Sequence, residues 1–178
     1  MGHDFLDKRL SLMDLMPIML GALSEPQKAF LDKAITEAYE NKGISLDDLD
    51  IEVTDFELNP QVLKNDTDTA IISETVFSHL LRSNCPVTNQ PDWGTVFVRY
   101  RGKQICHKSL LAYIISFRRH CGFHEQCVER MFADVWRTFQ PERLMVYAAY
   151  TRRGGLDINP CRISHADWLP TPLRLARQ

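Results

Sequence analysis

Residues 69–100 read TAIISETVFSHLLRSNCPVTNQPDWGTVFVRY, and this segment sets the order of the elements around it. Its first part, Thr69–Leu81, is rich in Ile, Thr, Val and Phe, which predicts a strand. Asn84–Pro86 ends that strand, and the chain returns in a second strand, Thr95–Tyr100. The segment therefore predicts a β-hairpin with a long, polar connection. The alternating residues Ile51–Leu58 predict a further strand before it.

Two amphipathic segments follow the hairpin. His107–His120 and Phe123–Phe139 place apolar residues at helical spacing, and Gly122 separates them. Beyond them, Leu144–Thr151 predicts another strand, and a glycine turn is expected to return the chain in a last one, Leu156–Asn159. The predicted order is β-β-α-α-β-β. This order favours the α+β class, with an antiparallel sheet that carries two helices on one face.

The first 45 residues differ in character from the rest. Ser24–Gln27 is a capping box with proline in the first helical turn, and apolar residues at helical spacing follow it. An earlier apolar stripe spans residues 12–23. Such an apolar face must be buried, either against the chain's own domain or against a partner. We therefore predict a helical extension, 1–45, followed by one domain, 46–178.

Composition argues against disordered, fibrous and membrane-spanning classes. The 178 residues are 44% hydrophobic and 25% charged, which is enough for one packed domain. No apolar run approaches the ~20 residues that span a bilayer, and charged side chains interrupt the first ten residues, where a signal peptide needs an apolar core. Five cysteines form no C-x-x-C pair. We expect a soluble, cytoplasmic protein with free thiols.

Charge is divided unevenly along the chain. Residues 1–60 hold 13 acids and 5 bases, whereas residues 61–178 hold 10 acids and 16 bases. The bases form no lysine-rich run, so they suit a phosphorylated small molecule better than a nucleic acid, although a solvated rim gives the same pattern. Tyr150–Gly155 combines two arginines with a glycine turn whose backbone can approach a phosphate.

The polar connection of the first hairpin holds a candidate nucleophile and acid. Cys85 and Asp92 lie seven positions apart in one loop, and a hairpin brings such positions close together. A thiolate can attack an unsaturated carbon, while a carboxylic acid supplies the proton that the product needs. This reaction requires an accessible, ionisable sulfur. The alternative is a small buried apolar residue at Cys85 and a turn-forming residue at Asp92.

His124 and Glu125 open the second helix. The free N–H groups at a helix start favour a carboxylate there, which alone accounts for Glu125. If Glu125 faces a ligand, it can instead accept two parallel N–H bonds from the edge of a guanine-type ring. Cys121, His124 and Cys127 also suggest zinc, but their spacing fits no zinc template and a fourth ligand is lacking nearby. We therefore predict no metal site.

Four segments of the chain resemble a known enzyme family. They are SNCPVTNQPDWG at 83–94, the FRR and FHEQCVER segments at 117–119 and 123–130, and YTRRGGLDINP at 150–160. Together they are similar to the catalytic half of the NADPH-dependent 7-cyano-7-deazaguanine reductases, the nitrile reductases of queuosine biosynthesis. The resemblance runs from about residue 46 to the end of the chain. It implies the tunnelling fold, and it matches the C-terminal half of the long form, which has two such halves.

The resemblance implies a role for each candidate residue at the substrate. Cys85 would attack the nitrile to form a covalent thioimide, and Asp92 would donate the proton. His124 and Glu125 would hold the deazaguanine ring. A nitrile carbon accepts hydride poorly until a thiolate has added, so the residues suit the chemistry.

The resemblance also implies NADPH as cofactor, contacted by Arg153 and Gly154, and a homo-oligomer whose sites lie near subunit interfaces. Long-form members carry a Glu-Ser-Lys-Ser-type stretch in their first half, and residues 1–45 contain none. His107–Leu110 occupies the corresponding element without the glutamate. The sequence thus predicts a nitrile reductase, with a catalytically impaired binding module as the alternative.

Overall fold

The structure is a computed structural model, and the residues it describes are 24–29, 43–54, 56–66, 70–172, 175 and 178. The chain divides into two compact units, Met1–Gly43 and Ile44–Gln178. In the first unit residues 25–29 are helical, and the Gln27 side chain accepts hydrogen bonds from N and Oγ of Ser24, each 2.9 Å long. The predicted helix start is therefore confirmed. The apolar stripe at 12–23 and the continuation of the helix lie outside the described residues.

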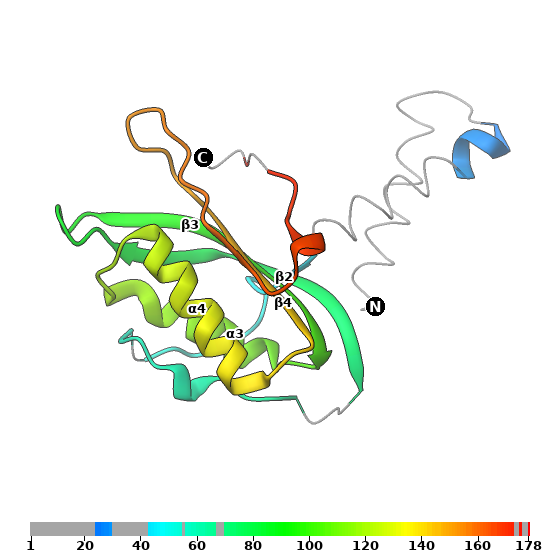
Figure 1. Cartoon of the computed structure of the whole chain (residues 1–178), viewed down its shortest axis with the longest axis horizontal. Coiled ribbons are helices and arrows are strands. Elements are labelled where there is room, and N and C mark those ends of the chain that lie inside the picture. Colours follow the sequence, from blue (N-terminus) through cyan, green and yellow to red (C-terminus); the bar gives the residue numbers. More distant parts are fainter. Residues whose placement is uncertain (1–23, 30–42, 55, 67–69, 173–174, 176–177) are drawn as a thin grey trace. The chain divides into compact units, whose positions relative to one another are not determined.

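The second unit is built on a five-stranded sheet in the order β1-β2-β3-β4-β5 (Figure 1). The pairs β2–β3, β3–β4 and β4–β5 are all antiparallel, which confirms the predicted antiparallel arrangement and the α+β class. The short first strand is a parallel addition at the edge. The strands are β1 (Ile44–Ser45), β2 (Ile71–Asn84), β3 (Pro91–Lys103), β4 (Arg143–Tyr150) and β5 (Cys161–Ile163).

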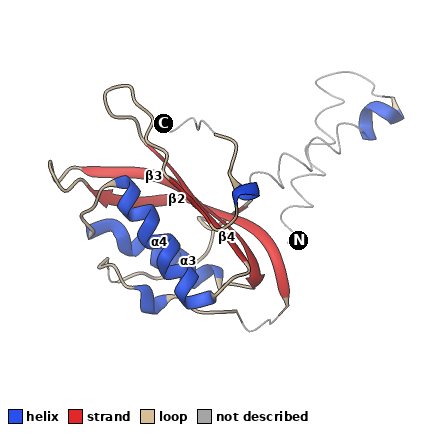
Figure 2. Cartoon of the chain, viewed as in Figure 1, coloured by secondary structure: helices blue, strands red, loops and turns tan. Residues whose placement is uncertain are grey.

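Two helices cover one face of this sheet, as the sequence predicts (Figure 2). Helix α3 (His107–Ser116) continues into a 3₁₀ turn, η2 (Phe117–Arg119), and α4 (His124–Phe139) follows after a short link. The two helices join β3 to β4, so the predicted element order holds through this part of the chain. Among the described residues, no helix is both long and apolar enough to cross a membrane.

The main core lies between the helices and the sheet. Val76, Val98 and Val146 stand side by side on three neighbouring strands, and each is at most 2% exposed. Ile114 of α3 and Met131 of α4 are each 1% exposed and belong to the same cluster. Truncating such a side chain to alanine costs about 2–5 kcal/mol. This packing fixes the helices against the strands that carry the site.

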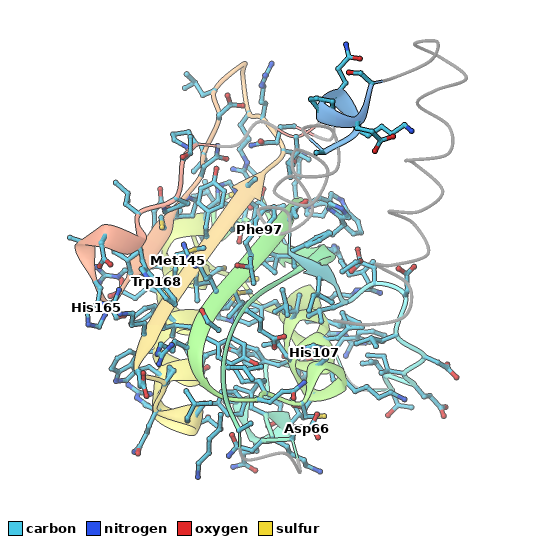
Figure 3. The ribbon with its side chains drawn as sticks, turned by 90° about the vertical axis from the view of Figure 1, so that its right-hand side faces the viewer. Asp66, Phe97, His107, Met145, His165 and Trp168 are labelled. Carbon is cyan, nitrogen blue, oxygen red and sulfur yellow. The ribbon has the colours of Figure 1, made fainter. Side chains whose placement is uncertain are left out.

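The other face of the sheet carries a smaller aromatic cluster. Phe97 and Met145 project there and pack with Trp168 of the 3₁₀ turn η3 (Ala166–Trp168), as Figure 3 shows. The Arg99 guanidinium lies 4.4 Å from the centre of the Trp168 ring. The segment after β5 therefore folds back over part of the second face.

The predicted strand at Ile51–Leu58 is wrong. The described residues of this segment form no strand, and they pack against the helical layer. Phe56 lies under the guanidinium of Arg118, 5.4 Å from it, and the N–H of Asn59 donates to Ser116 Oγ over 3.4 Å. The apolar residues of this segment are partly buried against the main core, which requires no partner strand.

The predicted return strand at Leu156–Asn159 is also wrong, because β5 begins at Cys161. Arg153 and Leu156 bridge each other across a tight local turn. Proline has no N–H with which to extend a ladder. The carbonyl of Pro160 instead accepts the N–H of Ala148 over 3.0 Å, and strand pairing starts immediately afterwards.

Candidate active site

The thiol of Cys85 lies immediately after β2, in the connection to β3. The N–H of Cys85 donates to the Gln90 carbonyl over 2.9 Å, and the N–H of Asn89 donates to the Cys85 carbonyl over 2.8 Å. Asn89 has a φ of 55°, a conformation that asparagine adopts more readily than most residues. Ser83 pairs with Asp92 across the hairpin. The closed loop therefore brings Asp92 to the same end of the sheet as Cys85.

Asp92 faces the first residue of α4. His124 Nε2 lies 3.2 Å from Asp92 Oδ2, and both side chains are only 6% exposed. The two atoms do not reach hydrogen-bond geometry, and within the described part of the chain His124 Nε2 has no other hydrogen-bond partner. The start of the helix is fixed by the Gln126 side chain, which accepts the N–H of Phe123 over 3.1 Å. A buried ring nitrogen thus remains free to bond a ligand.

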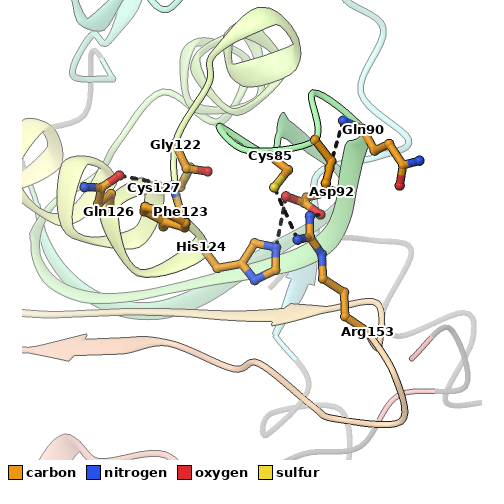
Figure 4. Close-up of polar contacts among 10 residues, drawn as sticks. Cys85, Gln90, Asp92, Gly122, Phe123, His124, Gln126, Cys127 and Arg153 are labelled. Atoms are coloured by element: carbon orange, nitrogen blue, oxygen red, sulfur yellow. Dashed lines mark hydrogen bonds and ion pairs between the residues drawn. The ribbon is translucent and has the colours of Figure 1, made fainter.

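Arg153 joins the nucleophile to the acid (Figure 4). Its Nη1 lies 3.4 Å from Cys85 Sγ, and its Nη2 donates to Asp92 Oδ1. Arg153 comes from the connection between β4 and β5, where Gly154 and Gly155 have φ values of 56° and 82°. Its side chain is 40% exposed. One guanidinium therefore contacts both groups from the solvent side.

The sulfur is less accessible than the sequence reasoning requires, since Cys85 is only 3% exposed. Its surroundings are nevertheless polar. Hydrogen bonds from the Thr88 side chain, from Arg153 and from the N–H groups of Thr88 and Val87 lower its pKa from 9.0 to about 6. A thiol with that pKa is mostly thiolate at neutral pH.

The other candidates lie apart from this cluster. Glu125 is exposed in the first turn of α4, and Gly154 is exposed at the tip of its turn. Cys121 is exposed, whereas Cys127 is buried, and burial raises the pKa of Cys127. Within the described part of the chain, no group of three or more His, Cys, Asp or Glu residues is placed to hold a metal ion.

Two residues at the site were not identified from the sequence. Thr88 contributes the largest single effect on the Cys85 thiol, although only its place in the same loop indicates this. Tyr150 stacks on His124, with ring centroids 4.0 Å apart. Tyr150 sits among apolar strand residues, so the local pattern indicates only a core residue.

Fold and site together define a class: an α+β protein whose antiparallel sheet presents an activated thiol, a carboxylate and a histidine at one end. Residues 91–167 match the family model described as QueF-like protein. The NADPH-dependent 7-cyano-7-deazaguanine reductase of Acinetobacter baumannii strain SDF is 61% identical over 142 residues, which are 80% of this chain and 53% of that protein. The enzyme of the same name from Acinetobacter baylyi is 51% identical over 179 residues, covering 99% of this chain and 66% of that protein.

The chain is a homologue of these 7-cyano-7-deazaguanine reductases, and its residues 91–167 carry the match to the QueF-like family. It spans about half the length of most of the relatives that it matches. Among solved structures, the apo form of the archaeosine synthase QueF-Like has a TM-score of 0.46 and 18% identity, covering 56% of this chain and 96% of that chain.

Proposed function

We propose that this chain catalyses the NADPH-dependent reduction of the nitrile of 7-cyano-7-deazaguanine to a primary amine, through a thioimide on Cys85. The observation that carries the proposal is the contact of Cys85 with Arg153, which also binds Asp92. Homology supports it, because the relatives carry this activity in their names.

The covalent step uses the Cys85 thiolate, which follows β2, and the Asp92 acid, which is the second residue of β3 rather than part of the loop as the sequence predicted. Cys85 adds through sulfur to the nitrile carbon, and the nitrogen takes one proton from Asp92, which gives a neutral thioimide. Asp92 is then free to regain a proton through His124, whose Nε2 lies 3.2 Å away. The carbon is now an electrophile that accepts hydride readily.

The residues around the turn after β4 fit the cofactor. The Arg153 side chain is 40% exposed, and a Cβ placed on Gly154 or Gly155 would meet nothing within 4 Å, so a phosphate can approach this backbone. Two molecules of NADPH, bound one after the other, would each supply one hydride to the former nitrile carbon and leave as NADP⁺. Cys85 leaves as thiolate between the two deliveries, and a second proton completes the amine.

The ring of the substrate would be held at the start of α4. His124 Nε2 is buried, it makes no hydrogen bond with any residue that the structure describes, and it faces Asp92. Glu125 is exposed in the same turn and can accept two N–H groups from the edge of the ring. We further propose that the unit works as a homo-oligomer, which analytical ultracentrifugation of the purified chain would test.

The test combines intact-mass analysis with NADPH oxidation. The purified chain, incubated with 7-cyano-7-deazaguanine alone, should gain the mass of one substrate molecule, and this adduct should disappear when NADPH is added. Cys85→Ala should form no adduct, whereas Cys161→Ala, a cysteine of β5, should behave like the unsubstituted chain. An adduct that persists in NADPH would favour the binding module. Absence of any adduct would refute the proposal.

A further inference from the structure

Tyr150 ends β4, and its ring lies flat against the imidazole of His124. The ring centroids are 4.0 Å apart, and the ring planes differ by 19°. Tyr150 is completely buried, and His124 is 5% exposed. This stack joins β4 to the start of α4, two elements whose relative position no local sequence signal sets.

The Tyr150 ring also leans over Gly94, its partner on β3. A Cβ at residue 94 would lie 3.1 Å from Cδ1 of this ring and 3.3 Å from Cε1, closer than nearly all real contacts. A side chain there would displace the Tyr150 ring from the position in which it stacks on His124. Gly94, which has no side chain, therefore leaves room for the Tyr150 ring to stack on His124.

His124 needs this support because its position decides where Nε2 points. The residue is the first of α4, and in this structure Nε2 lies 3.2 Å from Asp92 Oδ2. A rotation of the imidazole about its bond to Cβ would swing Nε2 away from the carboxylate. An aromatic ring stacked on one face restricts that rotation.

We infer that Tyr150 is a positioning residue, which holds the His124 imidazole in the plane where Nε2 meets Asp92 and the substrate, and that Gly94 provides the space for it. This inference rests on the proposed function, because it takes His124 to be a substrate-binding residue.

The hydroxyl of Tyr150 has no part in this role. Its oxygen is buried, and among the described residues no group meets it at full hydrogen-bond geometry, although Ser83 and Cys127 are close enough to affect its pKa. Burial raises the pKa of Tyr150 well above its ordinary value, so the hydroxyl stays protonated. The ring alone therefore acts on His124, and phenylalanine can replace it.

The experiment measures the rate at which the chain forms the Cys85 adduct with 7-cyano-7-deazaguanine. Tyr150→Phe should react at the unsubstituted rate, whereas Tyr150→Leu should react about tenfold more slowly or worse, since small misplacements of a reacting group have effects of that size. Gly94→Ala should also slow the reaction. Gly102→Ala is its matched control, because this glycine is equally crowded, by Pro141, at the far end of β3. Iodoacetamide labelling of Cys85 should have the same pH midpoint in all four variants.

A second measurement separates positioning from folding and from the proposed function. In NMR spectra, the ring current of residue 150 should shift the His124 ring protons in the unsubstituted chain and in Tyr150→Phe, but not in Tyr150→Leu. Loss of this shift with an unchanged adduct rate would overturn the inference. If the unsubstituted chain forms no adduct, the proposed function fails, and the inference then depends on the ring-current shift alone. His124 ring protons that resonate at the same positions in Tyr150→Leu and in the unsubstituted chain would overturn it.

Discussion

Replacing Arg153 by methionine should make the Cys85 thiol less acidic. Arg153 Nη1 lies 3.4 Å from Cys85 Sγ, and it is one of the groups that lower the pKa of Cys85 from 9.0 to about 6. Methionine keeps a long side chain over the sulfur but removes the charge and the donor. The Thr88 hydroxyl, whose effect on Cys85 is larger, remains in place. The pKa should therefore rise above 6 without returning to 9.0.

The size of the effect follows from the thiolate fraction. With a pKa of about 6, half of the thiol is ionised at about pH 6, whereas a rise of about one unit, the lower end expected for losing a nearby opposite charge, leaves about one tenth. Alkylation by iodoacetamide at about pH 6 should therefore slow about fivefold, because only the thiolate reacts.

The assay follows labelling of Cys85 by peptide mass spectrometry across a range of pH. Its readout is the midpoint of the rate profile, since uncovering the sulfur changes the plateau rate but not the midpoint. Arg152→Met is the matched control, because Arg152 Nε donates to Asp157 over 2.7 Å. A midpoint that stays at the unsubstituted value in Arg153→Met would refute the assignment of this guanidinium to the thiolate.

Three further outcomes test the structure away from this contact. Tyr113→Phe removes a 2.8 Å hydrogen bond to the Asp134 carboxylate, which is 4% exposed; urea unfolding should show a loss of about 1.5–3 kcal/mol, and adduct formation should not change. A hydrogen bond with Glu74 raises the pKa of His107, so its stabilising effect is complete below about pH 6.5 and is lost as the pH rises through the folded-state pKa. The stability difference between the unsubstituted chain and His107→Gln should accordingly shrink with rising pH, and a constant difference would contradict this. Burial raises the pKa of Cys127, so iodoacetamide should label it more slowly than the site thiol, as time-resolved mass spectrometry would show.

Local sequence patterns predicted a strand or helix correctly where the bounds of that element depend on its own residues. Thr69–Leu81 predicted most of β2, and the observed start of α4 at His124 is within one residue of the prediction. The two strand predictions that were wrong have the same cause. Ile51–Leu58 has a strand pattern but packs on helices, and Leu156–Asn159 follows a glycine turn but lies before the proline that delays pairing until Cys161. Strand formation depends on a partner, which alternation alone does not supply.

The sequence by itself determined the chemistry that is available: a thiol and a carboxylate in one hairpin, a histidine at a helix start and an arginine beside a glycine turn. The tertiary structure alone decided that these groups meet, and it added the Tyr150 ring behind His124. Arg153 reaches Cys85 across 68 positions of sequence, and it does so because β4 pairs with β3 and ends beside the loop. Side-chain periodicity sets which face a residue occupies, whereas contacts between distant residues depend on how the sheet and helices pack.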